Sequence, residues 1–417
     1  MNQMVLYFII PTLSGGVRSL LRSAVKTLAF GAVLLGSFTG SAMAVTPKQP
    51  THSPAIEPTS AVIFSYQRVD EDLYPDTSIR AEQFADHVQE LIDGDYNIVK
   101  LDTIVDALKT GARLPDRTIA ITFNGGHKSA YENAMPLLLK KDIPFTVFLS
   151  TDHLDAKSPL HVSWDDVKKL RRNDLVSFGL HPAIYTRLTD ADETEIRRQV
   201  NNAIVRYRAV FKTEPKFFAY PFGEYTQAYR DIVAASGFTA AFGQQSGVAY
   251  AGSDMFSLPR FPMTESYGDL DRFRMAATAL PFPVSELTPT DPYVAAKDKP
   301  MIGFTIDPIM MARADDISCF ISGEDKPEMK RVGTNKNRIE LRMDDAFSDE
   351  RIRINCTAPG PKPAAGEDQR WRWFGMLLSV ALPSPSASDA SEIGHGEGYR
   401  YPPSEIDPRA TRGAVEP

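Results

Sequence analysis

The sequence predicts an α/β protein: a domain built on a parallel sheet or barrel, followed by a small all-β domain. From residue 61 to about residue 280, short apolar runs alternate with segments whose apolar residues recur at helical spacing. The alternation stops at the proline-rich stretch 281–300, which is expected to be a linker, and only strand-like runs follow in 301–383. With 43% apolar and 24% charged residues among 417, the composition is ordinary for a folded globular chain.

The elements of the first domain, residues 61–280, follow one another at regular intervals. Strands are expected at residues 61–66, 98–101, 119–123, 145–149, 175–178, 217–219 and 238–242. Helices are expected at residues 81–92, 104–108, 130–140, 164–170, 193–211 and 227–235. The strands are short, apolar and rich in β-branched residues, which is typical of parallel strands covered on both faces. Because α/β folds place functional groups where the carboxyl end of a strand feeds a helix, residues at these junctions are the first candidates for a site.

The N-terminal segment, residues 1–44, has the features of a signal peptide. Basic residues precede an apolar stretch at 27–38, and Ala42-Met43-Ala44 supplies the small residues of a cleavage site. The apolar stretch is short for a bilayer span, so the mature chain is expected to be exported, periplasmic or secreted, without a stable membrane span. Residues 45–60 and 384–417 are rich in Pro, Ser, Thr or Gly, and are expected to be a linker and a disordered tail.

The C-terminal part, residues 301–383, contains both cysteines of the chain, Cys319 and Cys356. Its strands are expected at 301–306, 317–321, 338–343, 351–356 and 371–378. In an oxidising compartment the cysteine pair favours one disulfide over a zinc site, because two thiols without nearby histidines cannot complete a zinc shell; two buried free thiols are the alternative. The aromatic run 371–374 is either a platform for a sugar or part of the core, and core packing is favoured because one face of a strand must be buried.

Four segments near strand ends carry the candidate functional residues. Thr122-Phe123-Asn124-Gly125-Gly126 completes the strand at 119–123, and His181-Pro182-Ala183-Ile184-Tyr185 follows the strand at 175–178. Phe218-Ala219-Tyr220-Pro221-Phe222-Gly223 overlaps the strand at 217–219, and Leu258-Pro259-Arg260-Phe261 comes after the strand at 238–242. Over residues 61–275 these segments resemble those of the polysaccharide deacetylases with a NodB homology domain, also called carbohydrate esterase family four. The resemblance implies that the first domain is a deformed (β/α) barrel of that type.

The resemblance also implies roles for individual positions, and several functional residues of the family are replaced. The family's first motif reads T-F-D-D-G; its first Asp is the catalytic base and its second binds a divalent metal, and Asn124 and Gly125 stand at these positions. The second motif, H-x-x-x-H, keeps one metal-binding histidine as His181 and has Tyr185 in place of the other. In the third motif the backbone N–H after the proline helps to hold the acetyl oxyanion, and here that donor is the amide of Phe222. The residues that the resemblance places at the substrate are Tyr220, Pro221, Phe222, Gly223, Trp164 and Arg260.

These replacements bear directly on the reaction that the family catalyses. Hydrolysis of an N-acetyl amide needs a metal-activated water, a base and an acid for the leaving amine. An amide side chain cannot accept a proton near neutral pH and glycine offers no ligand atom, while the late histidine that supplies the acid has no counterpart, because only His395 follows His181. The sequence therefore favours an exported deacetylase-like protein that binds N-acetylated polysaccharide, is catalytically impaired and uses no cofactor. A net charge of −7 disfavours nucleic acid as a partner.

Two other functions stay open. If His127 and His181 met a carboxylate such as Asp70, Asp72 or Asp152, they would rebuild a site for zinc or another divalent metal, and the chain would be an active glycan N-deacetylase. A histidine at the start of a helix, such as His127, is more often an exposed residue without a ligand role. The third function is a structural envelope protein that uses neither the cleft nor its chemistry.

Overall fold

The computed structural model describes residues 57–295, 299–323, 327–343, 347 and 349–381. The signal peptide expected at 1–44, most of the linker at 45–60 and the tail at 384–417 lie outside these ranges, so they stay predictions. None of the helices in the described ranges is both long and apolar enough to cross a membrane.

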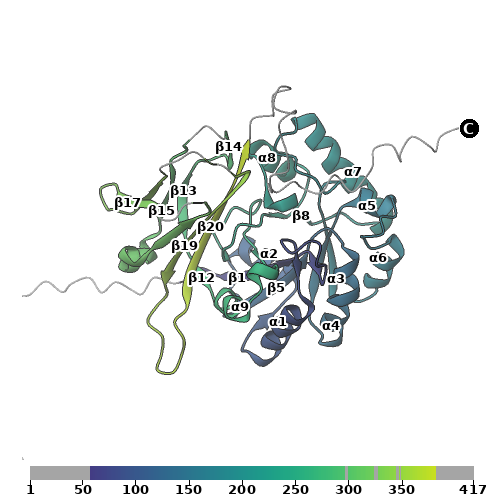
Figure 1. Ribbon diagram of the computed structural model, residues 1–417, viewed down its shortest axis with the longest axis horizontal. Helices are drawn as coiled ribbons and strands as arrows, with labels where there is room; N and C mark the ends of the chain where they lie inside the picture. The colour runs from purple at the N-terminus through teal and green to yellow at the C-terminus, as the bar shows by residue number, and fades with distance from the viewer. Residues whose placement is uncertain (1–56, 296–298, 324–326, 344–346, 348, 382–417) are drawn as a thin grey trace, which may run out of the picture. The chain divides into compact units, whose positions relative to one another are not determined.

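The first domain is a curled parallel sheet with helices around it, so the predicted deformed (β/α) barrel is confirmed (Figure 1). Its main strands run in the order β1, β5, β6, β7, β8 and β9, and neighbouring strands in this series are parallel. Their bounds are β1 Ser60–Tyr66, β5 Thr118–Phe123, β6 Phe145–Leu149, β7 Val176–Leu180, β8 Phe217–Ala219 and β9 Ala240–Phe242. Two shorter strands extend the sheet: β4 (Asn97–Ile98) pairs with β5, and β10 (Ala249–Tyr250) pairs antiparallel with β1.

The segment that follows β10 lies between the first and last strands of this curled sheet. Leu258 forms a parallel bridge with Phe242 at the end of β9, and three residues later β11 (Phe261–Pro262) pairs with β1. Arg260 lies between these two contacts, and its side chain is fully buried. The guanidinium group of Arg260 therefore lies inside the barrel, beside the carboxyl ends of β1 and β5.

Helices cover the outside of the sheet, and the longer ones each bury an apolar face. The bounds are α1 Ala81–Asp93, α2 Leu101–Thr110, α3 Lys128–Asn133, α4 Met135–Lys140, α5 Thr151–Asp155, α6 Trp164–Leu170, α7 Glu193–Phe211, α8 Gln227–Ala235 and α9 Leu270–Ala277. The longest, α7, begins at its N-cap Asp192, whose side chain accepts a hydrogen bond from the Glu195 amide. Its buried residues include Ile196, Val200 and Ala203, three or four positions apart, as expected for a helix that packs on a sheet.

Two predicted elements differ from the structure for local reasons. The single helix predicted at 130–140 is two short helices, α3 and α4, which meet at Ala134. Pro136 lies in the first turn of α4, and because proline has no N–H it cannot continue the hydrogen bonding of α3. The strand predicted at 98–101 ends at Ile98, since Leu101 already starts α2.

The short strands β2 (Arg68–Val69) and β3 (Ser78–Ile79) form a separate pair, and 3-10 turns lie at Pro221–Gly223, Glu265–Tyr267 and Pro308–Asp316.

Two further sheets form the C-terminal part. One contains β12 Leu280–Pro281, β14 Tyr293–Ala295, β16 Ser318–Ile321, β19 Arg351–Pro359 and β20 Trp371–Ala381. The other contains β13 Val284–Thr288, β15 Ile302–Ile306, β17 Glu328–Val332 and β18 Arg338–Arg342. The stretch 281–300, expected as a bare linker, thus contributes strands to both sheets. Its prolines lie at the ends of these strands or between them, where no ladder N–H is needed.

In the aromatic run 371–374, Trp373 and Phe374 are half-buried and pack against core residues, as the favoured interpretation expects of them. The ring of Phe374 lies 4.8 Å from that of Phe304, within the core shared by the two sheets. The ring of Trp373 meets Phe261 of the barrel edge-on at 5.2 Å, and its indole N–H donates to Asn355 at 3.1 Å. Strand β20 therefore binds the C-terminal sheets to the barrel.

Cys319 and Cys356 form the disulfide that the sequence predicted. They are directly paired positions of the neighbouring strands β16 and β19. Cys356 is fully buried and Cys319 is half-buried.

Loss of this disulfide should destabilise the C-terminal sheets. Replacing both Cys319 and Cys356 by Ala should lower the free energy of unfolding by about 2–4 kcal/mol, because the bond closes a sequence separation of 37 residues in the unfolded chain. Urea unfolding of the oxidised protein and of the double variant measures the difference. Dithiothreitol should reproduce the loss in the wild type and leave the variant unchanged; equal stability of oxidised wild type and variant would contradict the prediction.

Candidate functional site

Predicted site residues lie at the carboxyl ends of three strands: Asn124 follows β5, His181 follows β7, and the turn Pro221–Gly223 follows β8. Gln67, which was not among the predicted residues, follows β1. Because these strands are parallel, their carboxyl ends meet at one edge of the sheet. Arg260 joins the group from the segment between β9 and β1. We call this edge the barrel mouth.

Asn124 is held tightly by buried partners. Its amide nitrogen donates to Ser65 Oγ at 2.9 Å, and its Oδ1 accepts a hydrogen bond from Arg260 Nη1 at 2.9 Å. Its exposed fraction is 1%. The residue at the position of the family's base is therefore an amide that accepts one hydrogen bond from a cation and has no carboxylate to receive a proton.

Arg260 is the cation of this pair, and its surroundings are neutral. Its Nε donates to the carbonyl of Gly243 at 2.8 Å, and its Nη1 donates also to Thr122 Oγ1 at 3.2 Å. Its Nη2 has no hydrogen-bond partner within the described ranges. Burial lowers the pKa of Arg260 to about 9, which still leaves it mostly protonated at neutral pH.

A chain of hydrogen bonds crosses the barrel mouth from β8 to β5. The amide N–H of Phe222, the predicted oxyanion donor, donates to the hydroxyl of Tyr185 at 3.3 Å. Tyr185 donates in turn to Gln67 Oε1 at 3.5 Å, and Gln67 Nε2 lies 3.3 Å from His127 Nε2. Burial raises the pKa of Tyr185, so its phenol keeps the proton that it donates. Tyr185, which stands where the family has a metal ligand, therefore accepts the hydrogen bond of the Phe222 N–H, the donor that the third motif supplies.

His181 is a neutral imidazole whose free nitrogen faces no protein partner. Its Nδ1 lies 2.6 Å from the carbonyl of Ala219, which assigns the proton to Nδ1 and leaves a lone pair on Nε2. Nε2 has no hydrogen-bond partner among the residues that the structure describes. Desolvation lowers the pKa of His181 to about 3, so the ring is neutral at physiological pH.

The ring of His127 fills the space that a side chain at position 125 would need. A Cβ built on Gly125 would lie 2.7 Å from His127 Nε2, closer than a non-bonded contact allows. Gly125 also has φ +80°, a conformation that glycine adopts without strain. The replacement of aspartate by glycine and the position of His127 therefore fit each other.

The residues at the mouth do not fit a divalent metal. Gly125 offers no ligand atom, the hydroxyl of Tyr185 is engaged with Phe222 and Gln67, and His181 is left as a single donor. In the described part of the chain, no group of three His, Cys, Asp or Glu side chains is arranged to hold a metal ion.

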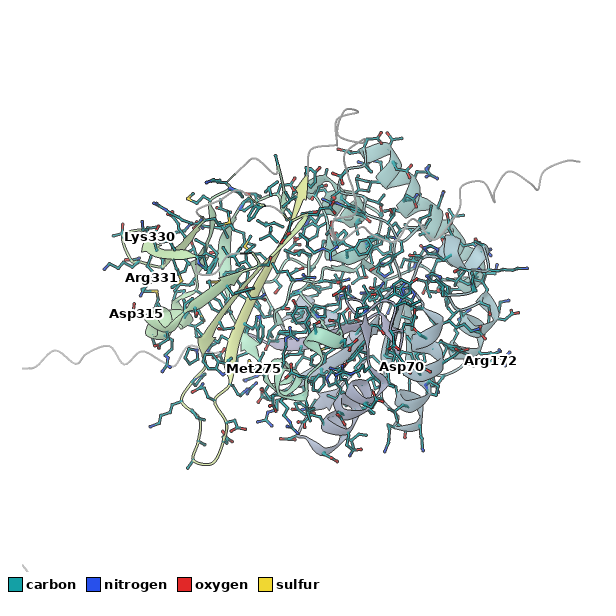
Figure 2. All side chains as sticks on the ribbon, viewed as in Figure 1. Asp70, Arg172, Met275, Asp315, Lys330 and Arg331 are labelled. Atoms are coloured by element: carbon teal, nitrogen blue, oxygen red, sulfur yellow. A yellow bond between two sulfur atoms is a disulfide. The ribbon has the colours of Figure 1, made fainter. Side chains whose placement is uncertain are left out.

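The carboxylates considered for a rebuilt site do not complete one. Asp70 and Asp72 are exposed, and Asp70 lies at the barrel surface in the turn between β2 and β3 (Figure 2). Asp152 lies in α5, where its Oδ1 accepts a long hydrogen bond from Thr151 Oγ1 at 3.5 Å.

The sequence gives no signal for two histidines that lie beside His127. The rings of His153 and His161 stack with centroids 4.4 Å apart, and the His161 ring lies 4.7 Å from that of His127. His127 is therefore buried in a histidine cluster, and the expectation of an exposed helix-start residue is wrong. Residues 153 and 161 belong to no motif: His153 lies in α5, directly after the carboxyl end of β6, and an antiparallel bridge with His127 positions His161.

The aromatic residues expected to face a substrate are distributed differently. Tyr220 is fully buried, and its hydroxyl donates to the carbonyl of Phe256 at 2.9 Å, so its ring packs in the core. Trp164 is held on the helical side: its indole N–H donates to Asp155 at 2.7 Å and Arg206 lies over its ring. Phe222, by contrast, is half-buried at the mouth.

The turn at Pro221–Gly223 is fastened by two arginines from other parts of the chain. Glu224, whose side chain is only 1% exposed, lies 2.6 Å from Arg351 of β19 and 3.2 Å from Arg187. The Arg351 guanidinium also lies over the ring of Phe222, 5.4 Å from its centroid. The C-terminal sheet therefore contributes a side chain to the wall of the mouth.

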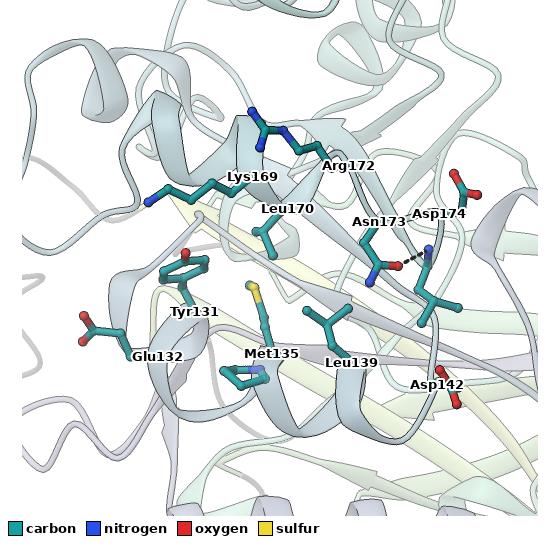
Figure 3. Close-up of a pocket in the computed structure, with 12 residues that line it drawn as sticks. Tyr131, Glu132, Met135, Leu139, Asp142, Lys169, Leu170, Arg172, Asn173 and Asp174 are labelled. Atoms are coloured by element: carbon teal, nitrogen blue, oxygen red, sulfur yellow. Dashed lines mark hydrogen bonds between the residues drawn. The ribbon is translucent and has the colours of Figure 1, made fainter.

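A separate groove of about 810 Å³ lies between α3, α4 and α6 (Figure 3). Met135, Leu139 and Leu170 give it an apolar floor, and Lys169 and Arg172 lie at its rim. None of the predicted site residues lines it. The groove is therefore distinct from the barrel mouth.

Restoring the family's aspartate at position 125 should clash with His127. Gly125→Asp should lower the free energy of unfolding by about 2–4 kcal/mol, because it combines backbone strain at φ +80° with a contact on a buried, hydrogen-bonded ring. Adding His127→Ala should recover about half of that loss, since it removes the contact and leaves the strain. Urea unfolding of both single variants and the double variant tests this coupling; strictly additive losses would contradict it.

Comparison with known proteins agrees with the motifs. Residues 111–241 match the family model described as polysaccharide deacetylase. A poly-beta-1,6-N-acetyl-D-glucosamine N-deacetylase of Staphylococcus aureus (strain MSSA476) is 24% identical over 200 residues, which are 45% of this chain and 68% of the relative. A putative polysaccharide deacetylase of Bacillus subtilis (strain 168) is 19% identical over 179 residues, 43% of this chain and 63% of the relative.

Among solved structures, the fold is similar to that of IcaB from Ammonifex degensii, with a TM-score of 0.49, 22% identity and coverage of 54% of this chain and 99% of that one. The segment 111–241 runs from the end of α2 into β9 and includes Asn124, His181, Tyr185 and Phe222. Residues 111–241 thus match the polysaccharide deacetylase family model, in agreement with the motifs that resemble that family over residues 61–275.

Proposed function

We propose that this chain is an exported, deacetylase-like protein that binds N-acetylated polysaccharide at the barrel mouth and is impaired in hydrolysis. The observation that carries the proposal is the hydrogen bond from the Phe222 amide to the Tyr185 hydroxyl. It joins the donor that would hold an acetyl oxygen to the residue that replaces a metal ligand.

The impairment follows from the groups that the reaction requires. Asn124 cannot take a proton from water, and loss of a general base typically slows a reaction by about 10²–10⁴-fold. Without a metal, water keeps its high pKa and is a poor nucleophile at neutral pH. Since Gly125 and Tyr185 do not fit a metal, the chain lacks both a general base and a metal to activate the water.

Binding of an N-acetylated sugar needs fewer groups than hydrolysis: a hydrogen-bond donor for the acetyl oxygen and an apolar surface for the sugar ring. The Phe222 N–H is held in place by its turn, in which Phe222 has φ +58° and the flanking Glu224 is fixed by two arginines. An acetyl oxygen that replaces the Tyr185 hydroxyl on this donor would exchange one hydrogen bond for another, at little net cost. The half-buried rings of Tyr185 and Phe222, 4.9 Å apart, offer apolar surface for a sugar.

The glycan class is inferred from the Staphylococcus aureus relatives, which are poly-beta-1,6-N-acetyl-D-glucosamine N-deacetylases. Export is inferred from the signal-like segment 1–44. The alternative function, an active N-deacetylase, would need a metal-holding set that the described residues of the mouth do not form.

Binding of matched oligosaccharides tests the proposal. Isothermal titration should show that the protein binds N-acetylated β-1,6-glucosamine oligomers and binds the fully de-N-acetylated oligomers much more weakly. Tyr185→Phe should bind the acetylated oligomers more tightly, by about 0.5–1.5 kcal/mol, because it removes the hydroxyl that competes for the Phe222 N–H. No binding of either oligomer, by the wild type or the variant, would sink the proposal and leave the structural-protein function.

A further inference from the structure

Arg260 is a buried cation without a charged partner. Its side chain is fully buried, its acceptors are Gly243 O, Thr122 Oγ1 and Asn124 Oδ1, and its Nη2 is unpartnered within the described ranges. A buried charge is ordinarily paired, because desolvation is otherwise uncompensated. Replacing the amide nitrogen of Asn124 by an oxygen would supply the missing negative charge with the least rearrangement, because a carboxylate has the same shape as the amide.

The residue after Asn124 makes that conversion chemically accessible. Asn124-Gly125 is the single Asn-Gly pair in the 417 residues. An asparagine before glycine is the pair most open to attack by the following backbone nitrogen, because glycine has no side chain to obstruct the approach. In the described part of the chain, no acceptor takes a hydrogen bond from the Gly125 N–H, so this nitrogen is available.

We propose that Asn124 deamidates within the folded protein and becomes an aspartate paired with Arg260. The Gly125 nitrogen loses its proton and bonds to Asn124 Cγ, and the bond from Cγ to the amide nitrogen breaks with release of ammonia. Water then opens the resulting five-membered imide at the bond between Cγ and the Gly125 nitrogen. The net reaction consumes one water and exchanges the side-chain amide for a carboxylic acid and ammonia.

The protein contributes to this reaction at two points. Arg260 Nη1 already donates to Asn124 Oδ1, so it stabilises the negative charge that develops on this oxygen during attack and then pairs with the carboxylate. The fold also selects the product. Opening the imide at its other carbonyl would insert the β-carbon into the backbone at position 124, where the Asn124 N–H donates to Tyr66 O at 2.8 Å. The normal peptide linkage alone preserves this bond.

The consequence is a carboxylate at the position of the family's base, with Gly125 and Tyr185 unchanged. The chain thus changes its charge by one unit with age, and it does so without regaining a metal shell. This inference does not depend on glycan binding, because it concerns the buried pair alone.

Peptide mapping by mass spectrometry tests the proposal on the whole protein aged at mildly alkaline pH in ¹⁸O-labelled water. The expected result is one labelled aspartate at position 124 with a normal backbone linkage, while the same chain unfolded in urea gives mainly the β-linked isomer. Arg260→Met should slow the conversion in the folded chain by on the order of 10²-fold, the effect of losing one donor to a developing oxyanion. Asn133, which is followed by alanine, serves as the internal control.

Two results would overturn the inference: an intact Asn124 after a period that converts the unfolded chain, or a folded product dominated by the β-linked isomer. If Arg260→Met does not fold, a second variant decides the point. Asn124→Asp should melt at a higher temperature than freshly purified wild type, because it supplies the missing partner of Arg260; an equal or lower melting temperature would contradict the pairing.

Discussion

Replacing Glu224 by Gln should destabilise the protein by about 2–4 kcal/mol, because it leaves two guanidinium groups facing a neutral amide in a largely buried position. Glu224 lies between Arg187 and Arg351, and its side chain is 1% exposed while theirs are 15% and 23% exposed. Its carboxylate also accepts a hydrogen bond from Ser379 at 2.8 Å. The substitution keeps the size of the side chain, so the loss reports charge and hydrogen bonding rather than packing.

The same network supplies a matched control for this variant. Glu350 contacts Arg187 at 3.3 Å but is 44% exposed, so Glu350→Gln should cost no more than about 1 kcal/mol. Urea unfolding of both variants measures the difference. Because Arg351 lies over Phe222, Glu224→Gln should also weaken binding of acetylated oligomers, whereas Glu350→Gln should not. Equal losses of stability in the two variants would show that the burial of Glu224 has no energetic role.

Gly223→Ala should cost at least about 3 kcal/mol and disturb the turn that positions the Phe222 amide. Gly223 has φ +79°, and a Cβ there would lie 2.4 Å from the backbone nitrogen of Gln244 and 2.9 Å from its Cα. These are backbone atoms of the segment after β9, so the contact can be relieved only by moving the turn or that segment.

Gly237→Ala separates the clash from the cost of the backbone conformation. Gly237 has φ +91°, and a Cβ there would meet nothing within 4 Å, so its substitution should cost about 1–2 kcal/mol of strain alone. Thermal and urea unfolding of the two alanine variants, together with oligomer binding, test the comparison. A Gly223→Ala protein that is as stable as Gly237→Ala would contradict the tight approach of the turn to Gln244.

The sequence was sufficient for the barrel because its strands and helices carry strong local patterns. The apolar run before Asn124 and the helical spacing in α7 each predict one element from neighbouring residues alone. Motifs at strand ends likewise placed Asn124, His181 and Phe222 together, since parallel strands bring their carboxyl ends to one edge. The strands within 281–300 were missed because prolines interrupt every local period there, and their pairing partners lie far along the chain.

The interior of the site could be predicted less completely, because it depends on contacts between distant residues. Nothing in the sequence indicates that Tyr185 bonds to the Phe222 amide across 37 positions, or that His127 occupies the space beside Gly125. The burial of Tyr220 was also not predictable from its motif, which identifies the turn and not the direction of the ring. Local sequence predicts which residues reach the mouth; side-chain packing decides what each of them contacts.

Acetate release distinguishes a barrel mouth that binds glycan but is impaired in hydrolysis from an active deacetylase site. The freshly purified protein, with an amide at residue 124 verified by mass spectrometry, is incubated with N-acetylated β-1,6-glucosamine oligomers and excess zinc, cobalt or nickel. We expect oligomer binding with acetate release indistinguishable from that of the Asn124→Gln variant, because neither the base nor the metal shell is present. Repeated turnover by the wild type, abolished in Asn124→Gln, would contradict it and establish an active deacetylase.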